Sequence, residues 1–220
     1  MEAFKREEKI FLLLAITFVS LLIVSNVIAA KLITIGGLTV SAAAICYALT
    51  FFLTDTIAEI WGKKRTLYVI KLGFFGSVLS AIFIKLAIYM PAASFWTEQA
   101  EYQLILGANI RIVFASMVAY LISQYHDVWA FHFWKEKTKG KHLWLRNNFS
   151  TGASQLIDTI IFVTIAFSGT GTPLLAIIVG EYIIKLIISI LDTPLIYMFV
   201  NLIKRNVPFI DTAKNLNSTI

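Results

Sequence analysis

The chain has 220 residues, of which 58% are apolar and only 15% are charged. Soluble domains contain about 45–50% apolar and about 25% charged residues, so a soluble fold of this size could not bury so much apolar surface. The mean hydropathy of +0.78 reflects long apolar runs, and several of them match the roughly 20 residues that cross a bilayer. The single cysteine, Cys46, lies inside such a run, which excludes a disulfide scaffold. We therefore predict an all-α integral membrane protein whose residues 1–220 form a single membrane domain.

Six transmembrane helices result when the chain is divided at its polar clusters. The expected spans cover residues 10–30, 38–61, 67–90, 110–134, 149–167 and 174–203, with short loops between them. The first apolar run is too long for a signal-peptide core, so we expect it to remain in the mature chain. The polar segment 91–109 is interpreted either as a helix lying at the outer interface or as a loop.

The last expected span is unusually long. Its 30 residues correspond to about 45 Å of helix, whereas a hydrocarbon core measures about 30 Å. We expect this helix to tilt, to project or to break, and Gly180 and Pro194 are the candidate break points.

Basic residues are distributed unevenly between the connections. The net charge is +6 and the pI is about 9.4, but 14 of the 19 Lys and Arg residues lie in the two tails and in the second and fourth connections. Such clusters between apolar segments are typical of topology signals rather than of a nucleic-acid surface. We therefore predict that both termini are cytoplasmic, with the lipid bilayer as a partner and no nucleic acid.

Acidic residues inside the expected spans are the main candidates for a functional site. Four of them lie about 10–16 Å from the cytoplasmic ends of four different helices, namely Asp55, Asp127, Asp158 and Asp192. Because isolated carboxylates in lipid are costly, we expect the helices to turn this layer toward a shared polar interior.

Helical spacing adds partners to these carboxylates. Asp55 and Glu59 are four residues apart and share one helix face, and Glu181, Lys185 and Asp192 form a stripe on the last span. Lys185 is the expected internal counter-charge. At the outer end of the fourth span, Arg111 is expected either to anchor the lip or to pair with an acid. A stretch with small residues, Gly73 with Gly76 or Ser77, favours close helix packing.

The fourth and fifth spans share a short repeat. Ser123, Gln124 and Asp127 recur as Ser154, Gln155 and Asp158 with the same spacing. Because the two helices run in opposite directions, the repeat would present facing amides and carboxylates to a flat polar molecule.

No common catalytic motif accompanies these residues. The sequence has no phosphate-binding loop, no H-E-x-x-H pair and no Cys/His metal spacing. We therefore expect no metal and no cofactor, and the pattern favours moving a small polar molecule over transforming it.

Many residues of this chain match the pattern of one known family. They are Ser25, Asn26, Lys31, Thr54, Asp55, Glu59, Gly62, Lys63, Lys64, Arg65, Arg111, Ser116, Tyr120, Ser123, Asp127, Leu145, Arg146, Ser150, Thr151, Ser154, Gln155, Asp158 and Thr159. The combination, which runs from about residue 20 to 195, resembles the queuosine precursor transporter family, also called the vitamin uptake transporter family. Trp61 and Thr66 depart from it, because they stand where the pattern has tyrosine and alanine.

The resemblance implies an importer of 7-deazaguanine bases in the bacterial inner membrane. Such purine-like bases include queuine and the cyano and aminomethyl precursors of queuosine. A guanine-like edge offers adjacent N–H donors to a carboxylate, and its carbonyl requires a donor. The residues expected to bind the substrate are Asn26, Asp55, Glu59, Arg111, Gln124, Asp127, Gln155, Asp158, Lys185 and Asp192.

Two alternatives remain open at this stage. The first is the substrate-binding membrane subunit of an energy-coupling vitamin importer, which also has about six spans and no nucleotide site. The second is an intramembrane enzyme that uses Asp55 and Glu59 as metal ligands or as general acid and base. A homo-oligomer is compatible with either function.

Overall fold

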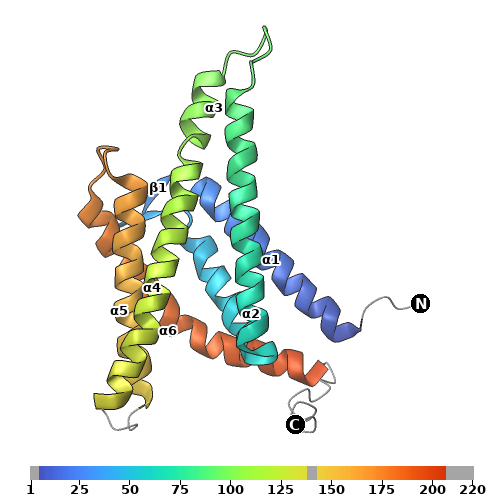
Figure 1. Ribbon diagram of the computed structural model, residues 1–220, viewed down its shortest axis with the longest axis vertical. Helices are drawn as coiled ribbons and strands as arrows, with labels where there is room; N and C mark the ends of the chain where they lie inside the picture. The colour runs from blue at the N-terminus through green and yellow to red at the C-terminus, as the bar shows by residue number, and fades with distance from the viewer. Residues whose placement is uncertain (1–4, 138–142, 207–220) are drawn as a thin grey trace.

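The structure, a computed structural model, describes residues 5–137 and 143–206 and is almost entirely helical (Figure 1). The elements are, in chain order, α1 (Arg6–Ile28), β1 (Leu32–Ile35), β2 (Leu38–Ser41), α2 (Ala44–Tyr89), α3 (Gln99–Leu106), α4 (Asn109–Lys137), α5 (Leu143–Phe167) and α6 (Leu174–Asn206). Helices satisfy their own backbone groups, which lipid cannot do, so this composition suits a membrane domain.

Helix α2 consists of two halves that meet at Gly62. That residue has φ 80° and ψ 168°, which are not helical values, and a positive φ is accessible to glycine at little cost. The halves, Ala44–Gly62 and Lys64–Tyr89, are each long and apolar enough to cross a membrane. They correspond to the second and third expected spans, and Gly62 supplies the turn between them.

The second expected span begins later than predicted. Residues 32–41 form an antiparallel hairpin in which Ile35 pairs with Leu38. Gly36 and Gly37 both have positive φ, which is the requirement of the tight turn that best matches strand twist. Because strand β2 occupies Leu38–Ser41, the prediction of a helix from residue 38 was wrong.

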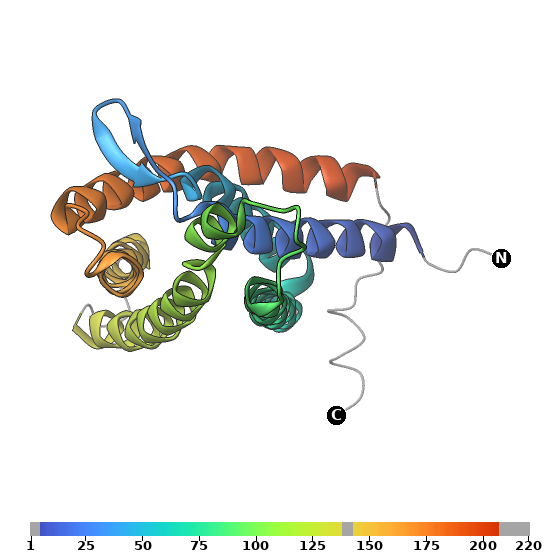
Figure 2. The ribbon, with the colours of Figure 1, turned by 90° about the horizontal axis from the view of Figure 1, so that it is seen from above.

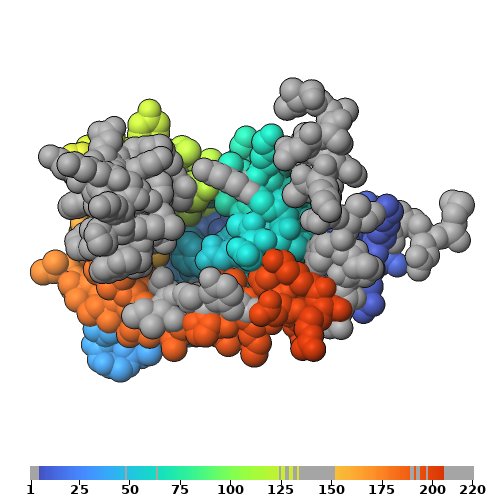
Figure 3. Space-filling model, turned by 90° about the horizontal axis from the view of Figure 1, so that it is seen from below, coloured from blue at the N-terminus to red at the C-terminus, as the bar shows by residue number. Residues whose placement is uncertain are grey.

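The hairpin lies against the beginning of α6 (Figures 2 and 3). A Cβ atom placed on Gly180 would lie 2.2 Å from the carbonyl oxygen of Thr39, so only glycine permits this approach. Helix α6 continues through Gly180 and Pro194 without the anticipated break. It is strongly inclined to α4 and α5 in Figure 1, and the expectation that it tilts in the membrane or projects from it stays a prediction.

Glycines also bring α1 close to the second half of α2. A Cβ on Gly73 would lie 2.8 Å from side-chain atoms of both Leu22 and Phe18, and one on Gly76 would lie 3.2 Å from Ile23. The packing role predicted for these two glycines is confirmed, as is common where small residues let membrane helices approach.

Segment 91–109 contains the short helix α3, so the helical interpretation of this segment is correct. In Figure 1, α3 stands beside the end of α2 and nearly in line with α4, rather than across the bundle. The stretch Gln99–Ser123, which combines α3 with the first part of α4, is apolar enough to cross a membrane. The position of α3 at the outer interface stays a prediction.

Four candidate membrane spans are found among the described residues: Arg6–Ile28, Ala44–Gly62, Lys64–Tyr89 and Gln99–Ser123. Helix α5 adds a shorter apolar stretch, Gly152–Phe167, and α6 occupies the sixth expected position. The chain is therefore a multi-pass membrane protein, while the count of six spans stays a prediction.

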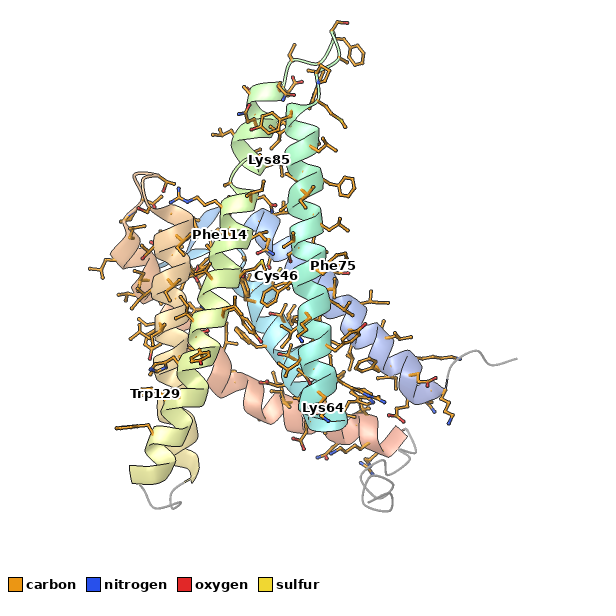
Figure 4. The ribbon with its side chains drawn as sticks, in the orientation of Figure 1. Cys46, Lys64, Phe75, Lys85, Phe114 and Trp129 are labelled. Carbon is orange, nitrogen blue, oxygen red and sulfur yellow. The ribbon has the colours of Figure 1, made fainter. Side chains whose placement is uncertain are left out.

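The connections with Lys or Arg clusters and the connections without them separate in space. The turn at Gly62 and the ends of α4 and α6 lie in the lower half of Figure 1, whereas the hairpin and the connections after α2 and α5 lie in the upper half. Lys64 and Lys85 accordingly lie near opposite ends of the second half of α2, with Phe75 projecting from its side between them (Figure 4). The side chain of Phe75 is 66% exposed, as expected of a lipid-facing residue.

Two apolar clusters hold the helices together. One joins α1, both halves of α2 and the end of α6 through residues such as Phe18, Ile57 and Ile203. The other joins α4, α5 and the beginning of α6 and includes Ile112 and Ile177. The candidate site lies beside the second cluster, between α5 and α6.

Candidate substrate-binding site

An ion pair links α5 to α6 inside the bundle. The Nζ atom of Lys185 lies 2.9 Å from Oδ2 of Asp158 and 3.0 Å from Oγ1 of Thr159, to which it also donates a hydrogen bond. The side chains of Lys185 and Asp158 are only 14% and 27% exposed. Lys185 is thus the counter-charge that the sequence predicted, because a charge at this position requires a partner.

Glu181 supplies a second carboxylate one turn before Lys185. The residue is 6% exposed, and its Oε1 atom accepts a hydrogen bond of 3.1 Å from the backbone N–H of Ser41. The close approach at neighbouring Gly180 holds β2 in position for this contact. Glu181 therefore ties the hairpin to α6 at the edge of the ion-pair cluster.

Tyr47 closes the cluster from the first half of α2. Its hydroxyl lies 3.2 Å from Oγ of Ser116 on α4, and its ring meets that of Phe162 edge-on at 6.5 Å between centroids. The hydroxyl, two carboxylates and one ammonium thus meet where four helices and β2 converge.

A small pocket opens between these residues. Its lining combines two charged groups with apolar and aromatic side chains, namely Ala44, Tyr47, Phe51, Glu181, Ile184, Lys185 and Ile188. The enclosed volume is about 20 Å³, room for about one water molecule. Pockets that hold small organic ligands measure roughly 300–1,000 Å³, so the helices must separate before a bicyclic base can enter.

Gln155 contributes an acceptor on the same face of α5 as Asp158 and Thr159. The residue lies one turn earlier, and its backbone carbonyl accepts a hydrogen bond of 2.8 Å from Oγ1 of Thr159. Its side-chain Oε1 is buried and has no hydrogen-bond partner in the part of the chain that the structure describes. A buried acceptor without a partner is costly, so this atom is suited to receive a donor from a ligand.

Two other candidate acids lie outside this cluster. Asp55 and Glu59 have exposed side chains, and Glu59 lies 3.8 Å from Lys204 near the end of α6. Neither residue lines the pocket. For Asp55, the expected place in a shared polar interior stays a prediction.

Asn26 and Arg111 also make other contacts. Asn26 is 2% exposed and bonds Ser77 on α2, which places it at the junction of α1, α2 and α4. Arg111 donates hydrogen bonds to the backbone carbonyls of Ile165 and Ser168. Since a cation at a helix C-terminus is favourable, Arg111 anchors the C-terminal end of α5, which agrees with the anchoring role that was one of the two predicted for it.

Three expected binding residues, Gln124, Asp127 and Asp192, have side chains outside the described part of the chain. Their backbones lie in α4 and α6. Gln124 and Asp127 belong to the first copy of the repeat, residues 123–127. This copy contacts the second, residues 154–158, through His126, whose Nδ1 lies 3.0 Å from Oγ of Ser154. The antiparallel pairing of α4 and α5 that the repeat required is thus present.

The sequence-based set of binding residues omitted Glu181, Tyr47 and Thr159. For Glu181 the available signal was its spacing from Lys185, with which it forms a stripe on the last expected span. Tyr47 carried no comparable signal, because one aromatic residue in an apolar helix is usually packing material. Its role depends on the angle at which α2 crosses α4 and α5.

Comparison with known proteins agrees with this architecture. Residues 41–199 match a family described as "Putative vitamin uptake transporter". The chain belongs to this family. It is 31% identical over 178 residues to the "Probable queuosine precursor transporter" of Bacillus subtilis (strain 168), an alignment that covers 79% of this chain and 77% of the relative. No solved structure matches the chain.

Family membership decides between two of the function classes raised by the sequence. The family and the relative are both named as transporters, and a transporter is what the short loops and buried polar groups predict. The chain is accordingly a membrane transporter for a small molecule and not an enzyme.

Proposed function

We propose that this transporter imports 7-deazaguanine bases, such as queuine or the cyano and aminomethyl precursors of queuosine, across the bacterial cytoplasmic membrane. The name of the Bacillus subtilis relative supports this substrate class. In the proposed orientation in the membrane, both termini and the basic connections lie on the cytoplasmic side, as the positive-inside rule favours. The hairpin and the connection between α2 and α3 then face outward.

The composition of the site supports a guanine-like ligand. A carboxylate accepts two adjacent N–H donors of such a base well, and the carbonyl beside them requires a donor. Glu181 and Lys185 line the same pocket, and the unpartnered Oε1 of Gln155 adds an acceptor on α5. Tyr47 and Phe51 supply aromatic faces against the rings.

The single observation that carries the proposal is the balance of charge in the buried cluster. Two carboxylates, Asp158 and Glu181, surround one ammonium, Lys185. Lys185 is bonded to Asp158, so Glu181 is left with the backbone N–H of Ser41. A ligand with N–H donors or a cationic aminomethyl group would complete this arrangement.

Binding of labelled queuine or the aminomethyl base to the purified protein tests the proposal. In Glu181→Gln the amide oxygen can still accept the Ser41 N–H, but the new NH₂ group would face ligand donors. We expect affinity to fall by about 5- to 150-fold, the cost of leaving one buried group unpaired, while thermal stability is retained. Ile160→Val, at a 42% exposed position on α5, is the matched control.

Two results would contradict the proposed site. Wild-type affinity in E181Q would exclude Glu181 from binding. Equal competition by adenine and by the deazaguanine bases would exclude the proposed recognition of a guanine-like edge.

A further inference from the structure

A second buried polar cluster lies where α1, the second half of α2 and α4 meet. It consists of Asn26, Ser77 and Asn109, which are 2%, 1% and 3% exposed. None of the three lines the pocket beside Lys185. Asn26 was expected from the sequence to bind the substrate, but the pocket proposed for the base leaves this cluster without a role.

Hydrogen bonding in the cluster is one-sided. Nδ2 of Asn26 donates to Oγ of Ser77 at 3.0 Å, and Nδ2 of Asn109 donates to the backbone carbonyl of Asn26 at 3.1 Å. Both amide nitrogens are thus engaged with the protein. Among the described residues, both amide oxygens, Oδ1 of Asn26 and Oδ1 of Asn109, are buried without a hydrogen-bond partner.

Two unpartnered oxygens in one cluster require a donor or a cation. Buried acceptors are rarely left unsatisfied, because desolvation is then uncompensated. Carboxamide, hydroxyl and carbonyl oxygens are ligands for hard cations. The three side chains carry no charge, which favours a monovalent over a divalent ion, and none of them can take up a proton.

Backbone geometry at the cluster also favours a cation. Helix α1 ends at Ile28, so Asn26 lies in its last turn, where the helix dipole is negative. The stretch Gln99–Ser123 is interrupted between the end of α3 at Leu106 and the start of α4 at Asn109. The C-terminal ends of such interrupted membrane helices are typical coordination sites for coupling ions. The N-terminal end of α4, which is positive, opposes the attraction of a cation. The negative C-terminal ends of α1 and α3 outnumber it.

We propose that Asn26, Ser77 and Asn109 form a sodium site that joins α1, α2 and α4. The ion is held by Oδ1 of Asn26 and Oδ1 of Asn109, with Oγ of Ser77 beside them. Its binding fixes the interrupted helix against α1, so any change in the relative position of these helices during transport would change its occupancy. This coupling to uptake rests on the proposed function, whereas ion binding does not.

Thermal unfolding of the purified wild-type protein tests the site directly. Tryptophan fluorescence is followed in sodium, potassium or choline chloride at equal ionic strength. Because a ligand that binds only the folded state raises the unfolding temperature, we expect a saturable increase in sodium over choline, with a smaller one in potassium. In Asn109→Ala the sodium affinity taken from this increase should fall about tenfold or more.

The sodium-dependent increase is compared within each variant, so a lower basal stability does not affect the conclusion. Asn201→Ala, which removes an exposed amide from α6, should keep the full increase, and Asn109→Ser serves if N109A does not fold. Equal unfolding temperatures in all three salts would show that buried water alone satisfies the two oxygens and would overturn the proposal. A sodium increase that persists unchanged in N109A would overturn it as well.

Uptake measurements separate this site from the substrate assignment. Proteoliposomes with an inward sodium gradient should accumulate the labelled base faster than those with a choline gradient. If sodium stabilises the protein but no deazaguanine base is taken up, the ion site stands and the proposed substrate fails. If the base is taken up with no effect of sodium on either measurement, the substrate stands and the ion site fails.

Discussion

Replacing Asp158 by asparagine separates a structural ion pair from a substrate ligand. The substitution keeps the size of the side chain but leaves Lys185 without the carboxylate at 2.9 Å. Removing one partner of a buried ion pair typically costs about 3–5 kcal/mol. Asp158 is 27% exposed, and Glu181 lies one turn from Lys185, so we expect the lower end, about 3 kcal/mol.

A double substitution isolates the charge effect. Asp158→Asn combined with Lys185→Met removes both charges, and loss of a whole buried pair is often close to neutral. We therefore expect the double variant to recover most of the stability that D158N loses. It should not recover binding of the base, because the charged side chains of Asp158 and Lys185 that form the site are gone.

The assay is thermal or denaturant unfolding in detergent together with equilibrium binding of the labelled base. Ile160→Val on the same helix controls for nonspecific effects on α5. Wild-type stability in D158N would refute the view that this ion pair holds α5 against α6. Wild-type binding in the double variant would refute the assignment of the substrate site to this cluster.

Two further experiments test the docking of the hairpin and the orientation of the chain. Gly180→Ala should destabilise the protein by about 1–3 kcal/mol, because its Cβ would meet the Thr39 carbonyl at 2.2 Å. Gly152→Ala is the control, since its Cβ would meet nothing closer than 3.9 Å. Equal stability of the two variants would show that the contact at Gly180 does not hold the hairpin. In a Cys46→Ser background, Glu98→Cys should react with an impermeant thiol reagent added outside whole cells, whereas Lys139→Cys should not. The reverse labelling pattern would invert the proposed topology.

Composition and periodicity were sufficient for the helices but not for their exact limits. The long apolar runs predicted the second and third spans. The basic cluster at residues 63–65 predicted a connection between them, and the turn at Gly62 lies beside this cluster. The start of the second span was misplaced because Leu38 and Val40 are as compatible with a strand as with an apolar helix. Only the Gly36–Gly37 turn and the packing of β2 on α6 decide between them.

The candidate site could be predicted in part. Lys185 and Asp158 were found because charges in apolar helices require partners, and the structure joins them. Depth along a helix does not determine the direction in which a side chain points, so depth alone could not distinguish Asp158, which pairs with Lys185, from Asp55, which does not line the pocket. The contact between Glu181 and Ser41 depends on the fold of residues 32–41 and could not be derived from spacing alone.

Uptake by the purified protein in proteoliposomes tests the central claim most directly. With no other protein present, wild-type transporter should accumulate labelled queuine or its aminomethyl precursor inside the vesicles, an excess of unlabelled deazaguanine base should block it, and E181Q should be strongly impaired. Uptake only after addition of ATPase and coupling partners would instead identify the chain as the binding subunit of a larger importer. Absence of uptake under both conditions, with a folded protein, would contradict the proposed substrate class.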